Sequence, residues 1–224
     1  METLKVREEK FAETFNKTIG DIVKRSNQTL RPEQYYQNLD IAQIIELKKT
    51  LSTVNNIITL KAAQAFVCKL KEMKIINADT AKNILEEINR QSGHENGYDI
   101  RCDYGNFKFI AEVKCNIPVG SKKECFDSGQ LAGIYKDLVS LSFRPKGGCP
   151  LQDYYKFMVF LDCKNIDKAI STLKKNQPEP ENYNIRTFKL TDNEIQTIWK
   201  NLVDNNIHLT SLLKEKIYIY KVTL

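Results

Sequence analysis

The sequence predicts a mixed α/β fold in which a small mixed β-sheet is flanked by helices. Two kinds of segment indicate this fold: strand-like runs rich in β-branched and aromatic residues, and longer stretches whose apolar residues recur at helical spacing. The run KFMVFLD at residues 156–162 is apolar on both faces, which is typical of a central strand covered on two sides. At 224 residues with 42% hydrophobic content, the chain is long enough to bury a full core.

The N-terminal part of the chain is predicted to be helical. Residues 5–25, 32–51 and 57–73 carry apolar residues at helical spacing, and Pro32 suits the first turn of the second segment. We expect these amphipathic helices to form an N-terminal subdomain, residues 1–76, that packs on the remaining core, contacts a binding partner or pairs with a second copy of the chain.

The core, residues 77–224, begins with a helix predicted over residues 79–93. Asn77 or Asp79 can cap its start, and Gly93 can end it. We expect the core and the N-terminal helices to form one compact unit. The buried stripe of the helix is predicted to consist of Ala81, Ile84, Leu85 and Ile88.

A β-hairpin is predicted next, because two strand-like runs flank Gly105-Asn106. Counting outward from that turn, Asp99 lies opposite Glu112. Directly opposed side chains have Cβ atoms roughly 4.5–5.5 Å apart, so two carboxylates there repel each other unless a cation lies between them. Lys114 shares the same face because it lies two residues beyond Glu112. The pattern therefore predicts a cation-binding patch on this hairpin.

Helices and strands alternate beyond the hairpin. Residues 126–143 are predicted to form a helix, and its small residues Gly129, Ala132 and Gly133 would let it lie close to the sheet. After the central strand, the predicted elements are a helix at 164–176, a strand at 183–190, a helix at 193–203 and a final strand at 216–224.

Asp99, the triplet Glu112-Val113-Lys114 on the next strand, the preceding helix and the following helix with Gln130 resemble the PD-(D/E)XK nuclease superfamily. The resemblance spans roughly residues 77–163, and restriction endonucleases are the members most similar in length and organisation. It departs from the motif at Tyr98, which stands where the motif name has Pro. It implies a restriction-endonuclease-like core and a Mg²⁺-dependent endodeoxyribonuclease that cuts double-stranded DNA at a specific sequence, as type II restriction enzymes do.

The same resemblance gives roles to individual residues. Asp99 and Glu112 would bind Mg²⁺, for which Mn²⁺ can substitute, with the backbone carbonyl of Val113 as a third ligand. Lys114 would hold the attacking water or the scissile phosphate. Gln130 would help to orient the water or the phosphate; the alternatives are a buried structural glutamine and a plain helix-surface residue.

The helix at residues 79–93 offers one more candidate. At 100° per residue, Glu87 lies beside the buried stripe, whereas Glu86 points nearly opposite it. Related nucleases often place a glutamate from this helix at the metal site, so the resemblance favours Glu87. The alternative is that both glutamates are solvated surface residues.

Other acid-x-Lys triplets occur in the chain, so the triplet alone is a weak signal. Residues 8–10, 46–48 and 72–74 have helix-like surroundings. Residues 162–164 end a predicted strand, but the nearest upstream acid, Asp153, lies on that same strand with no turn to bring it opposite.

Composition and charge narrow the class of protein. The net charge of +6 fits a polyanionic partner without requiring one. Six scattered cysteines without a Cys-x-x-Cys pair argue against a zinc ribbon or a thioredoxin-like motif. We expect a cytoplasmic protein without a membrane association, because no apolar run reaches the length of a membrane span and the N-terminus is too charged for a signal peptide.

Two polar loops, at residues 116–128 and 144–154, are expected next to the predicted site. Cutting both strands of a symmetric DNA site usually requires two active sites related by a two-fold axis, so a homodimer is expected. A restriction role further predicts a cognate methyltransferase encoded nearby. Candidate contacts to phosphates or bases are Lys122, Lys123, Arg144 and Lys146.

Two alternatives remain open at this stage. A repair or recombination nuclease, such as a resolvase, could have the same fold and the same site. The chain could also be a non-catalytic nucleic-acid-binding protein in which Asp99, Glu112 and Lys114 form an ordinary cluster of surface ion pairs, each contributing about 0–1 kcal/mol.

Overall fold

The computed structural model describes most of the chain. The described residues are 4–10, 13, 40–90, 97–105, 107–119, 124–175, 190–203 and 212–224. The chain divides into two compact units, Met1–Leu60 and Lys61–Leu224. This division falls inside helix α2, earlier in the chain than the predicted boundary after residue 76.

Helix α2 (Ile41–Glu72) is continuous where the sequence predicts two separate helices. Asp40 starts it, because its side chain accepts from the Gln43 N–H and its own N–H donates to the Gln43 side chain. The segment at residues 52–56, expected to be a break, contains neither Pro nor Gly. The Thr53 hydroxyl also bonds a carbonyl of the preceding turn, so nothing in this segment ends the helix. Residues 4–10, at the start of the helix predicted over residues 5–25, are helical.

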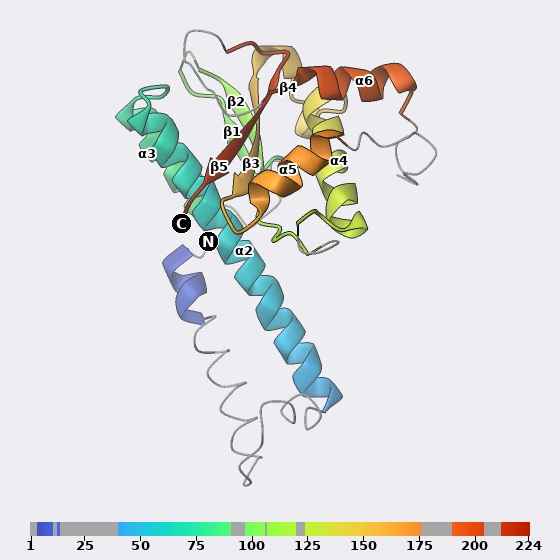
Figure 1. Cartoon of the computed structure of the whole chain (residues 1–224). Helices are drawn as coiled ribbons and strands as arrows, with labels where there is room; N and C mark the ends of the chain where they lie inside the picture. The colour runs from blue at the N-terminus through green and yellow to red at the C-terminus, as the bar shows by residue number, and fades with distance from the viewer. Residues whose placement is uncertain are drawn as a thin grey trace. The chain divides into compact units, whose positions relative to one another are not determined.

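The second unit contains a five-stranded mixed sheet with the order β1-β2-β3-β5-β4 (Figure 1). Strand β1 pairs with β2 antiparallel, and every other pairing is parallel. The mixed α/β class and the small flanked sheet match the prediction. The strands are β1 (Ile100–Cys102), β2 (Phe109–Lys114), β3 (Tyr155–Leu161), β4 (Leu202–Val203) and β5 (Ile217–Val222).

Four further helices and two short 3-10 turns accompany the strands in the described part of this unit. The α3 stripe is buried at three of its four predicted positions and half-buried at Leu85, and Asn77 caps the helix by accepting from the Thr80 N–H. The predicted stop at Gly93 and most of the predicted strand at 183–190 lie outside the described residues. The helices are α3 (Ala78–Arg90), α4 (Ser128–Ser142), α5 (Ile166–Lys175) and α6 (Asp192–Asn201), and the 3-10 turns are Lys146–Gly148 and Leu151–Asp153.

Helix α6 ends two residues earlier than predicted. Leu202 has an extended backbone, and Leu202 and Val203 pair with Ile217 and Tyr218 of β5. The sequence from 193 to 203 fits one helical pattern, but pairing with β5 takes its last two residues into the sheet. Tertiary context therefore overrides local propensity here.

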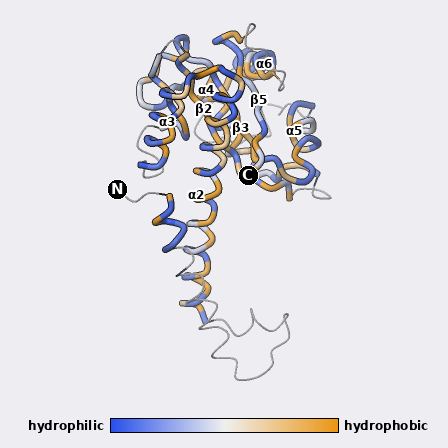
Figure 2. Tube along the Cα trace, turned by 90° about the vertical axis from the view of Figure 1, so that its left-hand side faces the viewer, coloured by the Kyte–Doolittle hydropathy of each residue, from blue (hydrophilic) through white to orange (hydrophobic). Residues whose placement is uncertain are grey.

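The sheet is covered differently on its two faces. On one face, Ile110, Met158 and Phe160 pack against residues of α4, α5 and α6, and Figure 1 shows these three helices on the same side of the sheet. On the other face, Phe66 of α2 contacts the rings of Phe109 and Phe157. Hydrophobic and hydrophilic residues alternate along α3 and α5 (Figure 2), and their buried residues recur at helical spacing, as expected for helices that pack with one face. Within the described residues, no helix combines the length and apolar character needed to cross a bilayer.

Candidate active site

The β1–β2 hairpin has the predicted register. Ile100 pairs with Ala111 and Cys102 with Phe109, so extending the ladder by one residue sets Asp99 opposite Glu112. Asp99 itself precedes the strand, and its Oδ2 accepts a hydrogen bond of 2.7 Å from the backbone N–H of Val113. The main chain of β2 therefore fixes the Asp99 carboxylate beside the predicted site.

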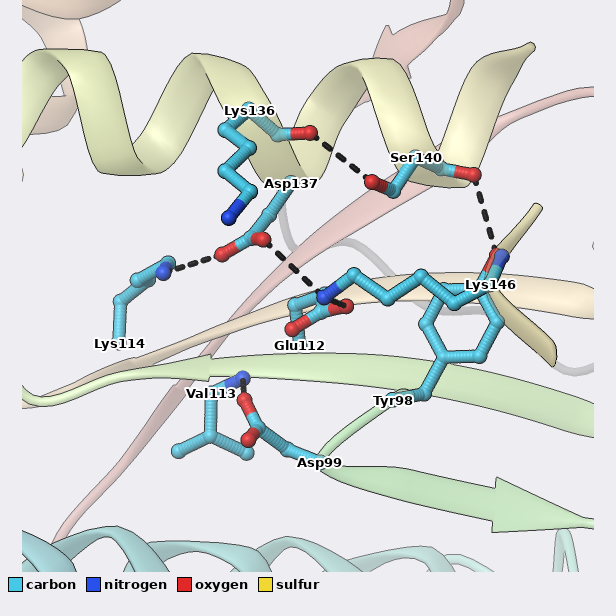
Figure 3. Close-up of polar contacts among 9 residues, drawn as sticks. All are labelled: Tyr98, Asp99, Glu112, Val113, Lys114, Lys136, Asp137, Ser140 and Lys146. Atoms are coloured by element: carbon cyan, nitrogen blue, oxygen red, sulfur yellow. Dashed lines mark hydrogen bonds and ion pairs between the residues drawn. The ribbon is translucent and has the colours of Figure 1, made fainter. Parts of the chain in front are cut away.

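Glu112 is the most deeply buried acidic residue of the hairpin. It is 3% exposed, and Figure 3 shows its side chain between β2 and α4. Its Oε1 accepts from the Lys146 Nζ at 2.5 Å. The same ammonium lies 3.3 Å from Oδ1 of Asp137, a buried residue of α4. A lysine from the loop after α4 thus joins carboxylates from two different elements.

Lys114 completes this group of charges. Its Nζ forms an ion pair with Oδ2 of Asp137, so the two oxygens of Asp137 each face a different lysine (Figure 3). Glu112, Lys114, Asp137 and Lys146 are called the β2–α4 cluster below. The predicted acid and lysine of β2 therefore lie together, but they are linked through Asp137 and Lys146.

The electrostatics of the cluster are dominated by burial and by excess acid. Burial and the negative charges of Asp137 and Asp99 together raise the pKa of Glu112 to about 8, against the opposing effect of Lys146. Burial alone would lower the pKa of Lys146, but the charges of Glu112 and Asp137 and their hydrogen bonds raise it. Three carboxylates share the region with two ammonium groups, so full ionisation leaves an excess negative charge. Sites with such perturbed groups are frequent candidates for function.

The donor chemistry of this region fits a hard divalent cation. Asp99, Glu112 and Asp137 supply only oxygen ligands, which Mg²⁺ and Mn²⁺ prefer. Within the part of the chain that the structure describes, no three His, Cys, Asp or Glu side chains are arranged to hold a metal ion. The ammonium of Lys146 lies instead between Glu112 and Asp137. Val113 contributes its N–H to Asp99, and the role of its carbonyl stays a prediction.

Gln130 and Glu87 are placed away from the cluster by their contacts. Gln130 is part of the capping box of α4 with Asp127, and its Nε2 donates to the Ile117 carbonyl at 2.8 Å. Glu87 lies near Tyr104, whose pKa its negative charge raises, at the opposite end of β1 from Asp99. Gln130 thus stabilises the start of the helix that carries Asp137.

The predicted basic contacts fall into three groups. Lys122 and Lys123 lie outside the described residues. Arg144 is exposed at the start of the loop between α4 and β3. Lys146, predicted as a DNA contact, has its ammonium inside the β2–α4 cluster.

Asp137 is the residue that sequence reasoning missed. A signal for it was present, because Asp137 shares a helical face with the buried residues Ile134, Leu138 and Leu141. An acid on the apolar face of a helix expected to lie close to the sheet needs a buried partner.

Comparisons with protein-family models, curated proteins and solved structures gave no match for this chain. The residues of the β2–α4 cluster and their geometry are therefore the basis for inferring a function.

Proposed function

We propose that this chain is a Mg²⁺-dependent endodeoxyribonuclease of the PD-(D/E)XK type. The observation that carries this proposal is the gathering of Asp99, Glu112 and Asp137 with two lysines around a single stretch of β2. Burying several carboxylates together costs free energy, because they lose their hydration and repel one another. A cation-dependent phosphodiesterase site uses such an arrangement directly.

The order of elements supports a restriction-endonuclease-like core. Helix α3 precedes the antiparallel pair β1–β2, and α4 then crosses over to β3, which runs parallel to β2. Helix, hairpin, helix and central strand are the elements on which the resemblance to this superfamily rests. In this arrangement Asp99, directly before β1, lies opposite Glu112, the first residue of the acid-x-Lys triplet of β2.

Each residue of the site has a distinct role in this proposal. Asp99 and Glu112 would hold the cation, and Asp137 would orient Lys114 through their ion pair. A cation held by Asp99 and Glu112 would supply charge that polarises the phosphate and lowers the pKa of a water bound to it. The Lys114 ammonium would position the attacking water or a phosphate oxygen and offset the negative charge that develops during displacement. Burial of Glu112 under α4 keeps competing water away from its carboxylate.

The substrate proposed is double-stranded DNA, cut at a specific sequence by a homodimer. The exposed side chain of Arg144 and the lysines at 122 and 123 are the candidates for phosphate contacts, which orient the duplex without selecting its sequence. A repair or recombination nuclease would use the same site on branched or damaged DNA.

One observation favours a different class of function. Lys114 and Lys146 already pair with the carboxylates, so the cluster could be a purely structural network in a non-catalytic DNA-binding protein. The two functions differ in one respect: only the nuclease cleaves DNA, and its cleavage requires a divalent cation and Lys114.

A cleavage assay separates these functions. The purified protein would be incubated with plasmid, phage, branched and single-stranded DNA, in Mg²⁺ or in EDTA. We expect discrete products that require Mg²⁺ and are lost in Lys114→Ala. The matched control is Lys164→Ala, which removes an exposed lysine from the acid-x-Lys triplet at the end of β3. If none of these DNA substrates is cleaved in Mg²⁺, the non-catalytic DNA-binding function is supported instead.

A further inference from the structure

Lys146 is a second lysine of the site, and it comes from outside the acid-x-Lys triplet. Its ammonium contacts Glu112 at 2.5 Å and Asp137 at 3.3 Å, and both carboxylates are buried. Hydrogen bonds between ions in such a place are about twice as strong as those between neutral groups. Lys146 therefore acts as the positive counterion for these two carboxylates.

The backbone around Lys146 is built to hold it there. The Tyr98 hydroxyl accepts from the Lys146 N–H at 3.2 Å and donates to the Ser140 carbonyl at 3.1 Å. The Lys146 Nζ also lies 5.6 Å from the centre of the Tyr98 ring. Gly97 approaches so closely that a Cβ there would lie 2.6 Å from the Lys146 Cβ. The residues just before Asp99 thus fix the loop that supplies this lysine.

A divalent cation bound to Glu112 would compete with the Lys146 ammonium, which contacts one oxygen of Glu112 and one of Asp137. Mg²⁺ binds oxygen at about 2.0–2.1 Å, and a cation on Glu112 at that distance would meet the ammonium on the same carboxylate. Two positive charges so close repel strongly in a poorly hydrated site.

We propose that Lys146 is a resident counterion of Glu112 and Asp137 that a divalent cation must displace in order to bind. This inference rests on the proposed metal-dependent function. Tyr98 holds the backbone of Lys146, so exchange requires only that the lysine side chain swing away from the carboxylates. Lys146 therefore sets how tightly the metal binds in the absence of DNA.

The first measurement is the affinity for Mn²⁺ without DNA, by electron paramagnetic resonance or calorimetry, at one fixed pH. Lys146→Met keeps the length of the side chain and removes its charge, and we expect its Mn²⁺ affinity to rise roughly tenfold, the effect of losing one charged hydrogen bond that opposes binding. Tyr98→Phe loosens the loop without changing any charge, and a smaller rise is expected. Lys164→Met makes the same change at an exposed lysine outside the β2–α4 cluster, is the matched control and should leave the affinity unchanged.

The outcomes separate this inference from the proposed function. If neither the wild type nor any folded variant binds Mn²⁺, the proposed metal-dependent function is itself wrong. Equal Mn²⁺ affinity in wild type and Lys146→Met would overturn the displacement while leaving that function intact, and so would weaker binding in Lys146→Met. Circular dichroism and thermal unfolding confirm that each variant is folded. If Lys146→Met does not fold, the comparison of Tyr98→Phe with wild type decides the matter alone.

Discussion

Acid-x-Lys triplets lie within β2 and directly after the adjacent strand β3; the first belongs to a buried charged cluster, whereas the second begins at an exposed acid. Glu112 of β2 is 3% exposed and is surrounded by Asp99, Asp137 and Lys146. Asp162, which follows β3, is exposed, and its N–H donates to the Val222 carbonyl at the edge of β5. The same kind of triplet therefore has a different chemistry at the two positions.

Position along the strand explains the difference. Glu112 pairs with Met158 in the middle of β3, so its triplet lies within the sheet and under α4. The triplet at 162–164 begins after β3 has ended. The covering helix α4 and the loop after it, which supply Asp137 and Lys146, therefore turn the triplet of β2 into a candidate site.

Removing the acid of each triplet is the strongest test of this contrast. Glu112→Gln should reduce Mg²⁺-dependent cleavage more than about 10³-fold, because it removes a proposed ligand and a charge at the reacting phosphate. Asp162→Asn is the matched change after the neighbouring strand and should leave cleavage unchanged. Single-turnover rates on plasmid DNA measure both effects. Equal cleavage rates for Glu112→Gln and wild type would show that the catalytic site does not include Glu112.

Asp137 tests the contribution of α4 to the contrast. Asp137→Asn keeps the shape of the side chain but weakens its hold on Lys114 and Lys146, so a loss of roughly 10–100-fold in cleavage rate is expected, as for groups that orient a catalytic residue. Asp167→Asn removes the exposed partner of Lys221 and serves as the control. A shift in the pH–rate profile of Asp137→Asn would show that it acts through Lys114, whereas lower stability alone would indicate a structural role.

The pH dependence of stability distinguishes Glu112 from Asp162 without any assay of function. The pKa of Glu112 is raised to about 8 in the native state, whereas in the unfolded chain a glutamate titrates near its ordinary value of 4.5. Between these values the native state binds more protons, so the free energy of unfolding falls as the pH rises. We expect metal-free wild type to lose stability between about pH 5 and 8, by an amount on the order of a few kcal/mol.

The variant Glu112→Gln should lack this pH-dependent loss, so its stability relative to wild type should increase with pH. Asp162→Asn should follow the wild-type curve. Thermal or urea unfolding in EDTA across this pH range gives the measurement. Parallel curves for Glu112→Gln and wild type would contradict the burial of an excess acid at this position.

Local patterns in the sequence were sufficient for much of the fold. The stripe of α3, the register of the hairpin and the central strand all depend on neighbouring residues, and these features match the structure. Glu112 and Lys114 are two residues apart on one strand, so their common face follows from the alternation of side chains.

Features that depend on distant residues could not be predicted in the same way. Lys146 lies 34 residues beyond Glu112 in sequence, and the packing of α4 and the close approach of Gly97 bring it to the site. Strand β4 also forms only because β5 is available as a partner. Gln130 fitted a functional role as well as a structural one, because a glutamine at the start of a helix serves both as a cap and as a site residue.

The smallest predicted effect concerns the start of α4. Gln130→Ala removes both the hydrogen bond to the Asp127 N–H and the bond to the Ile117 carbonyl, so stability should fall by roughly 1 kcal/mol. Gln130→Glu keeps a capping-box acceptor and should recover part of this loss. The matched change is Glu194→Ala, which removes the equivalent cap from α6 and should cost a similar amount. Thermal unfolding compares the stabilities of the two variants. Because α4 carries Asp137, only the Gln130→Ala variant should also increase hydrogen exchange at the amides of the β2–α4 cluster. Equal exchange in both variants would show that this cap does not support the site.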